Sequence, residues 1–129
     1  MFRQDKNQIK TCKVIILGES NAGKTSIITR FLSNDFDYNK FTISGADQNQ
    51  KTIFIRGLNK SINFEIWDTP GPRNFRALHR VLFQNTNAFI LVYDITNYSS
   101  FEELRNFWIN EVRDKAKNSY RILIFFLIL

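Results

Sequence analysis

Cysteine, histidine, proline and long apolar runs are scarce in this chain of 129 residues, and their scarcity excludes several kinds of protein. The single cysteine, Cys12, cannot form an internal disulfide, which excludes a disulfide-stabilised secreted domain. The longest apolar run, Ile122–Leu129, has eight residues, whereas a membrane-spanning helix needs about 20. The one histidine, His79, has no second histidine or cysteine near it, so we do not expect it to bind a metal.

The remaining composition is that of a globular protein. Hydrophobic residues make up 43% of the chain and aromatic residues 15%, and no linker or repeat divides it, so we expect one α/β domain over residues 1–129. The net charge of +6 arises from dispersed basic residues. Arg73, Arg76 and Arg80 share a helical face by their spacing, but no nucleic-acid module accompanies them. We therefore expect mainly solvated charges, no nucleic-acid partner and, without a visible signal peptide, a cytoplasmic location.

Residues 18–25 read G-E-S-N-A-G-K-T and fit the phosphate-binding pattern G-x-x-x-x-G-K-[ST]. The run Lys13–Leu17 before them predicts a buried strand, and Ser26–Leu32 after them has apolar residues at helical spacing. The alternative is a glycine turn that only caps a helix. With glycine near 7% of residues, a chance match in a chain of this length has a probability of roughly half a percent, so phosphate binding is favoured.

The residue types in this loop suit a polyphosphate. Gly18 and Gly23 allow the backbone N–H groups to approach the ligand, and the following helix directs its N-terminus toward the phosphates. Lys24 supplies a positive charge for the β and γ oxygens. Thr25 supplies a hydroxyl for Mg²⁺, which prefers oxygen ligands.

A second segment points to the same site. Alternating apolar residues over 62–66 predict a strand that leads into Asp68 and Gly71. Because ligands bind at the carboxyl ends of strands in open α/β sheets, Asp68 is expected beside the phosphate loop, where it can hold Mg²⁺ directly or through water. An ordinary Asp-x-x-Gly turn is the alternative, and the phosphate loop upstream disfavours it.

Periodicity predicts strands and helices along the whole chain. The strands are expected at 12–17, 51–57, 62–68, 88–93 and 121–127, and the helices at 24–33 and 101–116. The short polar turn 57–61 predicts a hairpin that makes the second strand an antiparallel edge, and the other connections predict parallel pairing. Cys12 is expected to be a small buried hydrophobe in the first strand.

The predicted helix 101–116 has its own signals. Ser100 and Glu103 form the pattern of a capping box. The apolar residues at helical spacing, which we expect to face the core rather than form a cofactor site, are Phe101, Leu104, Trp108 and Val112.

Together these motifs resemble the Ras superfamily of small GTPases, and within it the Rab branch. The resemblance covers roughly residues 10–125 and is carried by the phosphate loop, Trp67-Asp68-Thr69-x-Gly71, Phe75-Arg76 and the segments 91–96 and 100–102. It implies the three-layer P-loop NTPase (Rossmann-like) α/β fold, with a mostly parallel sheet, one antiparallel edge strand and the C-terminal part missing.

The resemblance also implies a GTP/GDP switch with bound Mg²⁺. Thr42 would close over the Mg²⁺ and the γ-phosphate, Gly71 would donate its N–H to that phosphate, and Phe36 matches the aromatic residue that lies against guanine. The nucleotide-binding residues would be Gly18, Glu19, Ser20, Asn21, Ala22, Gly23, Lys24, Thr25, Ser26, Phe36, Thr42 and Gly71. The magnesium ligands would be Thr25, Thr42 and Asp68, and no catalytic residue is assigned. Exchange factors, activating proteins and effectors would bind around Thr42 and Gly71.

The chain departs from the family pattern at Pro72. Small GTPases carry a glutamine there, which orients the attacking water. Proline has no side-chain amide and no backbone N–H, so the sequence predicts weak GTP hydrolysis. The family also continues beyond the last strand with Asn-Lys-x-Asp, which reads guanine, and with C-terminal cysteines for a lipid anchor. Neither is present in this chain, and we expect a truncated product.

Three classes of function follow. The first is a nucleotide-dependent switch, supported by the phosphate loop and Asp68. The second is a truncated pseudo-GTPase or interaction protein, favoured by Pro72 and by the missing guanine-reading motif. The third, a P-loop ATPase or kinase, is disfavoured because the segment Trp67–Gly71 matches small GTPases specifically.

Overall fold

The computed structural model describes residues 9–33, 47–69, 76–116 and 121–127, and for residues 76, 77 and 121–127 it describes the backbone alone. Its elements alternate strands with helices in chain order. They are β1 (Lys10–Leu17), α1 (Lys24–Ser33), β2 (Asp47–Ile55), the 3₁₀ turn η1 (Arg56–Leu58), β3 (Lys60–Asp68), α2 (Arg76–Leu82), β4 (Ala88–Asp94), α3 (Tyr98–Glu103), the π-helical turn η3 (Leu104–Trp108), α4 (Ile109–Lys115) and β5 (Arg121–Leu127).

The five strands form one sheet in the order β2-β3-β1-β4-β5. Strand β1 pairs in parallel with both β3 and β4, and β4 pairs in parallel with β5. Only β2 runs antiparallel, against β3. The predicted α/β fold with a mostly parallel sheet and one antiparallel edge strand is therefore confirmed.

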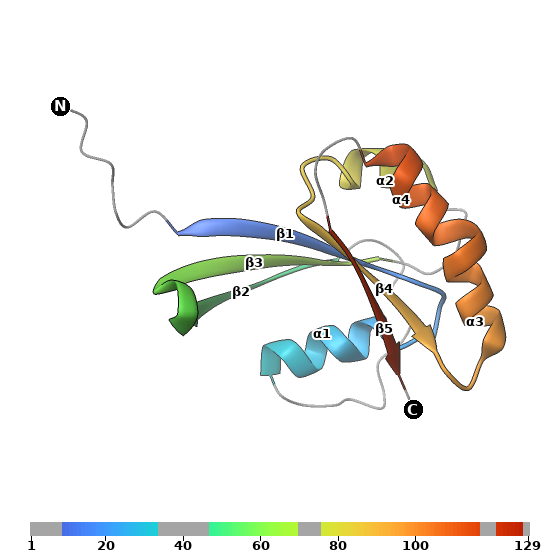
Figure 1. Cartoon of the computed structure of the whole chain (residues 1–129), viewed down its shortest axis with the longest axis horizontal. Coiled ribbons are helices and arrows are strands. Elements are labelled where there is room, and N and C mark those ends of the chain that lie inside the picture. Colours follow the sequence, from blue (N-terminus) through green and yellow to red (C-terminus); the bar gives the residue numbers. More distant parts are fainter. Residues whose placement is uncertain (1–8, 34–46, 70–75, 117–120, 128–129) are drawn as a thin grey trace.

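Helices cover both faces of the sheet, which gives three layers (Figure 1): α1 lies on one side and α2, α3 and α4 lie on the other. The alternation of side chains along β1 explains why both sides are apolar. Val14 and Ile16 pack into the cluster beneath α1, and Ile15 and Leu17 pack into the opposite cluster.

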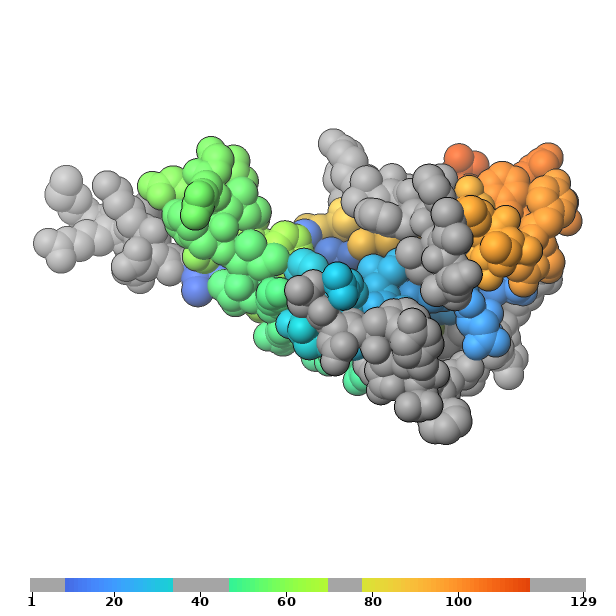
Figure 2. Space-filling model, turned by 90° about the horizontal axis from the view of Figure 1, so that it is seen from below, coloured from blue at the N-terminus to red at the C-terminus, as the bar shows by residue number. Residues whose placement is uncertain are grey.

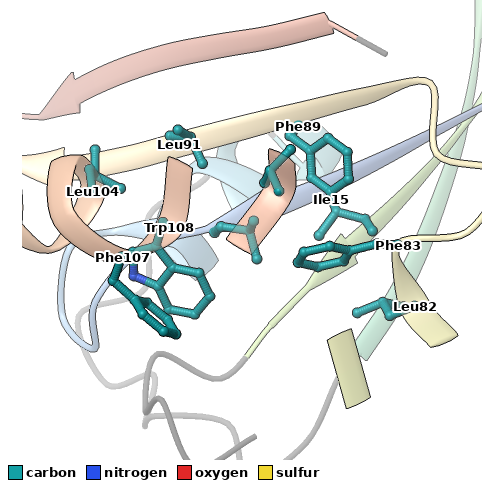
Figure 3. Packing of buried hydrophobic residues seen from close by; sticks show 10 residues of the cluster. Ile15, Leu82, Phe83, Phe89, Leu91, Leu104, Phe107 and Trp108 are labelled. Carbon is teal, nitrogen blue, oxygen red and sulfur yellow. The ribbon is translucent and has the colours of Figure 1, made fainter. Parts of the chain in front are cut away.

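The larger cluster lies between the sheet and the helices α2 to α4 (Figure 3). It contains two aromatic pairs: the rings of Phe83 and Phe89 meet edge to face with centroids 4.9 Å apart, and those of Phe107 and Trp108 do the same at 4.9 Å. Both Phe107 and Trp108 are buried, although they are neighbours in sequence. They lie within the wider π-helical turn η3.

The hairpin β2–β3 forms one end of the molecule and extends past α1 (Figure 2). Its turn is tighter than the predicted segment 57–61, because η1 begins at Arg56 and Asn59 takes a left-handed conformation with φ of 49°. The strand predicted at 51–57 is observed at Asp47–Ile55. It starts four residues earlier and ends two residues earlier than predicted.

The helix predicted at 101–116 is observed from Tyr98 to Lys115 as α3, η3 and α4, so the predicted start is wrong. The cap residue is Asn97, and Ser100 is a buried residue inside the helix whose hydroxyl bonds the carbonyls of Asn97 and Asp94. The capping-box interpretation of Ser100 is therefore also wrong.

The predicted inward stripe on this helix is correct except at its first residue. Leu104, Trp108 and Val112 are buried, whereas 37% of Phe101 is exposed, and its ring packs on those of Tyr93 and Tyr98.

Three further points differ from the sequence-based expectations. Helix α2 was not predicted, although Arg73, Arg76 and Arg80 have helical spacing. Lys13 is one of the dispersed basic residues, which were expected to be mainly solvated, but it is half-buried and donates hydrogen bonds to the carbonyls of Leu82 and Gln84, at and just after the end of α2, at 2.6 and 2.9 Å. Cys12 lies in β1 as expected but is only partly buried, and burial raises the pKa of its thiol.

Among the residues that the structure describes, no helix combines the length and the apolar character needed to cross a membrane.

Candidate functional site

The loop between β1 and α1 has the backbone conformation that its glycines suggest. Gly18 has φ of 151°, Asn21 of 65° and Gly23 of 100°, values that glycine adopts readily and that asparagine tolerates better than most residues. The N–H of Ala22 donates to the carbonyl of Glu19 at 3.2 Å, which closes the turn.

Gly18 has a second reason to lack a side chain. A Cβ atom placed on it would lie 2.3 Å from the carbonyl oxygen of Val92 in β4, which is far inside van der Waals contact. Sequence reasoning assigned this glycine to the approach of a ligand. The structure shows that it also permits the close packing of the loop against β4.

Lys24, the first residue of α1, is 94% buried and lies within the loop. Its ammonium group donates to the carbonyls of Gly18 and Glu19 at 2.8 and 2.6 Å. Burial lowers the pKa of Lys24 to about 8, and the negative charges of Asp68 and Glu19 offset part of that effect. The lysine is thus charged at neutral pH and is held at the centre of the loop.

Thr25 and Asp68 are 43 residues apart in sequence and meet at the site: the hydroxyl of Thr25 donates to Oδ2 of Asp68 at 2.5 Å. The register explains the meeting, because Asp68 ends β3 beside Ile16 of the neighbouring strand β1. Thr69 continues this anchoring by donating to the carbonyl of Ile16 at 2.6 Å. The expectation that Asp68 lies beside the phosphate loop is confirmed.

The other loop residues that were predicted to bind nucleotide differ in exposure. Asn21 is exposed, whereas Glu19, Ser20 and Ser26 are half-buried. Ala22 is buried and packs in the cluster beneath α1, so its side chain serves the core and only its backbone is available to a ligand.

Phe36, Thr42 and Gly71, together with Pro72, lie outside the described residues. Their predicted roles therefore stay predictions.

Sequence reasoning missed a buried polar group on the other side of the sheet. Nδ1 of His79 lies 3.0 Å from Oε2 of Glu111, and the ammonium of Lys115 lies 2.6 Å from the same oxygen. The i,i+4 spacing of Glu111 and Lys115 was visible in the sequence, but their contact with His79 depends on how α2 packs on α4.

Comparisons with known proteins agree with this geometry. The model of the Ras family matches residues 13–126. The chain is 43% identical over 106 residues to GTP-binding protein YPT53 of Saccharomyces cerevisiae, an alignment that covers 82% of this chain and 47% of that protein. It is 38% identical over 112 residues to Ras-related protein Rab-21 of Bos taurus, covering 87% of this chain and 49% of the relative.

A third relative is Ras-related protein RabC of Dictyostelium discoideum, which is 31% identical over 112 residues, covering 87% of this chain and 57% of that protein. The chain thus spans about half the length of the curated relatives that it matches.

Proposed function

Because this chain belongs to the Ras family and is similar to Rab and Ypt proteins, we propose that it binds guanine nucleotide with Mg²⁺ and acts as a switch of the Rab-like small GTPase type. YPT53 carries GTP binding in its name. The phosphate loop and Asp68, which would bind the nucleotide and Mg²⁺ in this proposal, both lie within the region that the Ras family model matches.

The observation that best supports the proposal is that Lys24, Thr25 and Asp68 lie together at the phosphate loop. Lys24 offers a buried positive charge at the start of α1, where backbone N–H groups are also directed outward. Such a set of donors suits the phosphate oxygens of a nucleotide.

The same geometry fits a magnesium ion. The hydroxyl of Thr25 and the carboxylate of Asp68 are both hard oxygen donors, and Mg²⁺ is commonly held by one or two such groups together with substrate phosphates. When bound, the ion would neutralise phosphate charge, and Thr25 and Asp68 would hold it.

The switch itself would depend on Thr42 and Gly71. In the proposed GTP state these residues would contact the ion and the γ-phosphate, and exchange factors, activating proteins and effectors would recognise the segments that contain them. Function in membrane trafficking is part of the same proposal and rests on the similarity to Rab proteins.

Pro72 leads us to propose that GTP hydrolysis is weak. Position 72 lies where small GTPases carry the glutamine that orients water, and proline has no group for this task. The same observation favours a second candidate function, a pseudo-GTPase or interaction protein that retains the fold without efficient turnover.

The test uses fluorescent GTP and GDP with and without Mg²⁺, ATP as competitor, and single-turnover hydrolysis. We expect Mg²⁺-dependent binding that GTP but not ATP displaces, and faster hydrolysis in Pro72→Gln than in the natural sequence. Binding that is unchanged in Lys24→Ala would refute the nucleotide site. Equal hydrolysis by the natural sequence and Pro72→Gln would refute the role given to Pro72.

A further inference from the structure

One end of the sheet extends beyond the helices that cover it (Figure 1). It is formed by residues 9–10 at the start of β1 and by residues 53–62 around the turn of the β2–β3 hairpin, and we call it the hairpin end. Figure 2 shows the hairpin as a projection at one end of the molecule. Asp68 lies at the opposite end of β3, so the hairpin end is separate from the phosphate loop.

Large apolar side chains are exposed at the hairpin end. The exposed fraction is 53% for Ile9, 56% for Phe54 and 60% for Leu58. Single exposed apolar residues are common on protein surfaces, but a group of them at one place marks a surface that binds something.

The register of the sheet shows how two of these side chains are placed. Lys10, Ile62 and Ile53 form one row across the three strands. Ile9 and Phe54 each lie one residue from that row, in both cases toward the hairpin turn. Because side chains alternate along a strand, Ile9 and Phe54 point to the same face of the sheet, and the side chains of the row point to the other face.

Basic side chains accompany the apolar ones. Lys10, Arg56 and Lys60 are exposed, and the part of the chain that the structure describes shows no ion pair for any of them. Acidic residues are absent from the sequence of this region, since residues 9–18, 24–33 and 48–64 contain neither aspartate nor glutamate. The described residues of the hairpin end therefore carry positive charge alone.

This combination matches the surface of a bilayer that contains anionic lipids. Apolar side chains enter the boundary between headgroups and acyl chains, and lysine and arginine keep their charge at the headgroups while their methylene groups lie along apolar surface. A nucleic acid would use the cations but would leave the aliphatic side chains of Ile9 and Leu58 in water. A stable protein interface has a continuous apolar centre, whereas basic and polar residues separate the apolar side chains here.

We propose that the hairpin end binds the surface of membranes that contain anionic phospholipids. Its three exposed apolar side chains enter the interfacial layer, and its three exposed basic side chains bind the headgroups. Each basic side chain at such a surface strengthens binding by about fivefold, so the contact is reversible and depends on salt. This inference goes beyond the proposed function and does not depend on nucleotide binding.

The experiment is flotation of the full chain with vesicles of phosphatidylcholine alone or of phosphatidylcholine with roughly one-third phosphatidylserine, at about 100 mM and about 500 mM salt. Flotation separates bound protein from aggregates, which do not float. We expect binding to the anionic vesicles at the lower salt concentration, with affinity about tenfold or more above that for neutral vesicles, and a clear loss at the higher concentration.

The contribution of charge is tested with a pair of double variants. Lys10→Gln combined with Lys60→Gln should weaken binding to anionic vesicles about 25-fold. Arg105→Gln combined with Arg113→Gln removes the same charge from exposed positions on η3 and α4 and is the matched control. Its effect should be about twofold at most, because salt screens charges that do not reach the membrane.

The contribution of the apolar side chains is tested in two ways. Phe54→Ser combined with Leu58→Ser should weaken binding roughly tenfold, whereas Val81→Ser, at the exposed α2 position, should not weaken it. A polarity-sensitive fluorophore attached to Leu58→Cys, in a Cys12→Ser background, should shift to the blue on adding anionic vesicles. The same fluorophore on Val81→Cys should not shift.

The inference is overturned if anionic vesicles float no protein, if the two charge variants lose affinity equally, or if the fluorophore on Leu58→Cys does not respond. Heparin, a soluble polyanion, tests the alternative of an acidic macromolecule in solution. Heparin binding as tight as vesicle binding, and insensitive to Phe54→Ser with Leu58→Ser, would also overturn the membrane assignment. Circular dichroism shows whether each variant remains folded, and the comparison of lipids and salt uses the natural sequence alone.

Discussion

Lys24 shows how one side chain responds to its place in the fold. Burial lowers its pKa to about 8, and the unfolded chain would hold the same proton up to the ordinary value of 10.5. Between these values the folded state binds fewer protons than the unfolded state, so Lys24 by itself makes the fold more stable as the pH rises through that window. A bound polyphosphate would reverse the effect by favouring the charged ammonium.

This reversal predicts proton uptake on nucleotide binding. At pH 8.5, a lysine with a pKa of about 8 is mostly deprotonated, so binding should take up a large fraction of a proton. Calorimetric titration with GDP in two buffers of different ionisation enthalpy measures this quantity. In Lys24→Met the uptake should disappear, and its persistence there would show that another group is responsible.

The contact between Thr25 and Asp68 joins residues that are distant in sequence, and it predicts a magnesium effect. Thr25→Val keeps the shape of the side chain and removes the hydroxyl, so we expect Mg²⁺ to bind about 10–100-fold more weakly in the nucleotide complex. Mg²⁺ titration of nucleotide dissociation measures this change. Thr29→Val, on the same helix, is the control, because its hydroxyl donates to the carbonyl of Thr25, one turn earlier in α1, at 2.9 Å. Equal losses in the two variants would contradict a specific role for Thr25.

Secondary-structure elements follow the sequence patterns well where one periodicity dominates. Helix α1 is observed at the predicted residues Lys24–Ser33, and the strands β3 and β4 lie within two residues of their predicted bounds. The patterns failed where tertiary contacts stabilise a segment. Helix α2 is held by its last residue, Leu82, by Phe83 directly after it, by Lys13 and by His79, none of which produces a strong local signal.

The connection from β1 to α1 gives a test at its first glycine. Gly18→Ala should destabilise the fold by about 2–4 kcal/mol, because the new Cβ would clash with the backbone of β4 and because alanine disfavours the φ of 151°. Gly57→Ala is a matched control, since no atom lies within 4 Å of its added Cβ. Chemical denaturation measures both variants. A loss of equal size in the two would show that the clash in the loop is relieved at little cost.

The molecule as a whole depends on two cores that share one sheet. Ile15 and Ile16 are adjacent in β1 but point to opposite faces, and they are 0% and 2% exposed. Because the same strand carries both cores, damage to either one should unfold the domain cooperatively.

We therefore expect Ile15→Ala and Ile16→Ala each to cost about 2–5 kcal/mol of unfolding free energy. Far-ultraviolet circular dichroism and tryptophan fluorescence should report the same transition midpoint within each variant. Val81→Ala, at a side chain that is 74% exposed, should change little. Different midpoints for the two probes would show that the layers unfold separately.

Local order in the chain was sufficient to predict the phosphate loop, the strand that precedes it, the helix that follows it and the antiparallel hairpin, because each depends on residues close in sequence. It was also sufficient to place Asp68 at the loop, since the ends of parallel strands meet at one edge of a sheet. The burial of Lys24, the clash that reserves position 18 for glycine, and the contact of His79 with Glu111 followed only from packing. Each of these depends on atoms that the fold brings together from distant parts of the chain. The periodicity of apolar residues indicates local structure and does not indicate which distant residues come into contact.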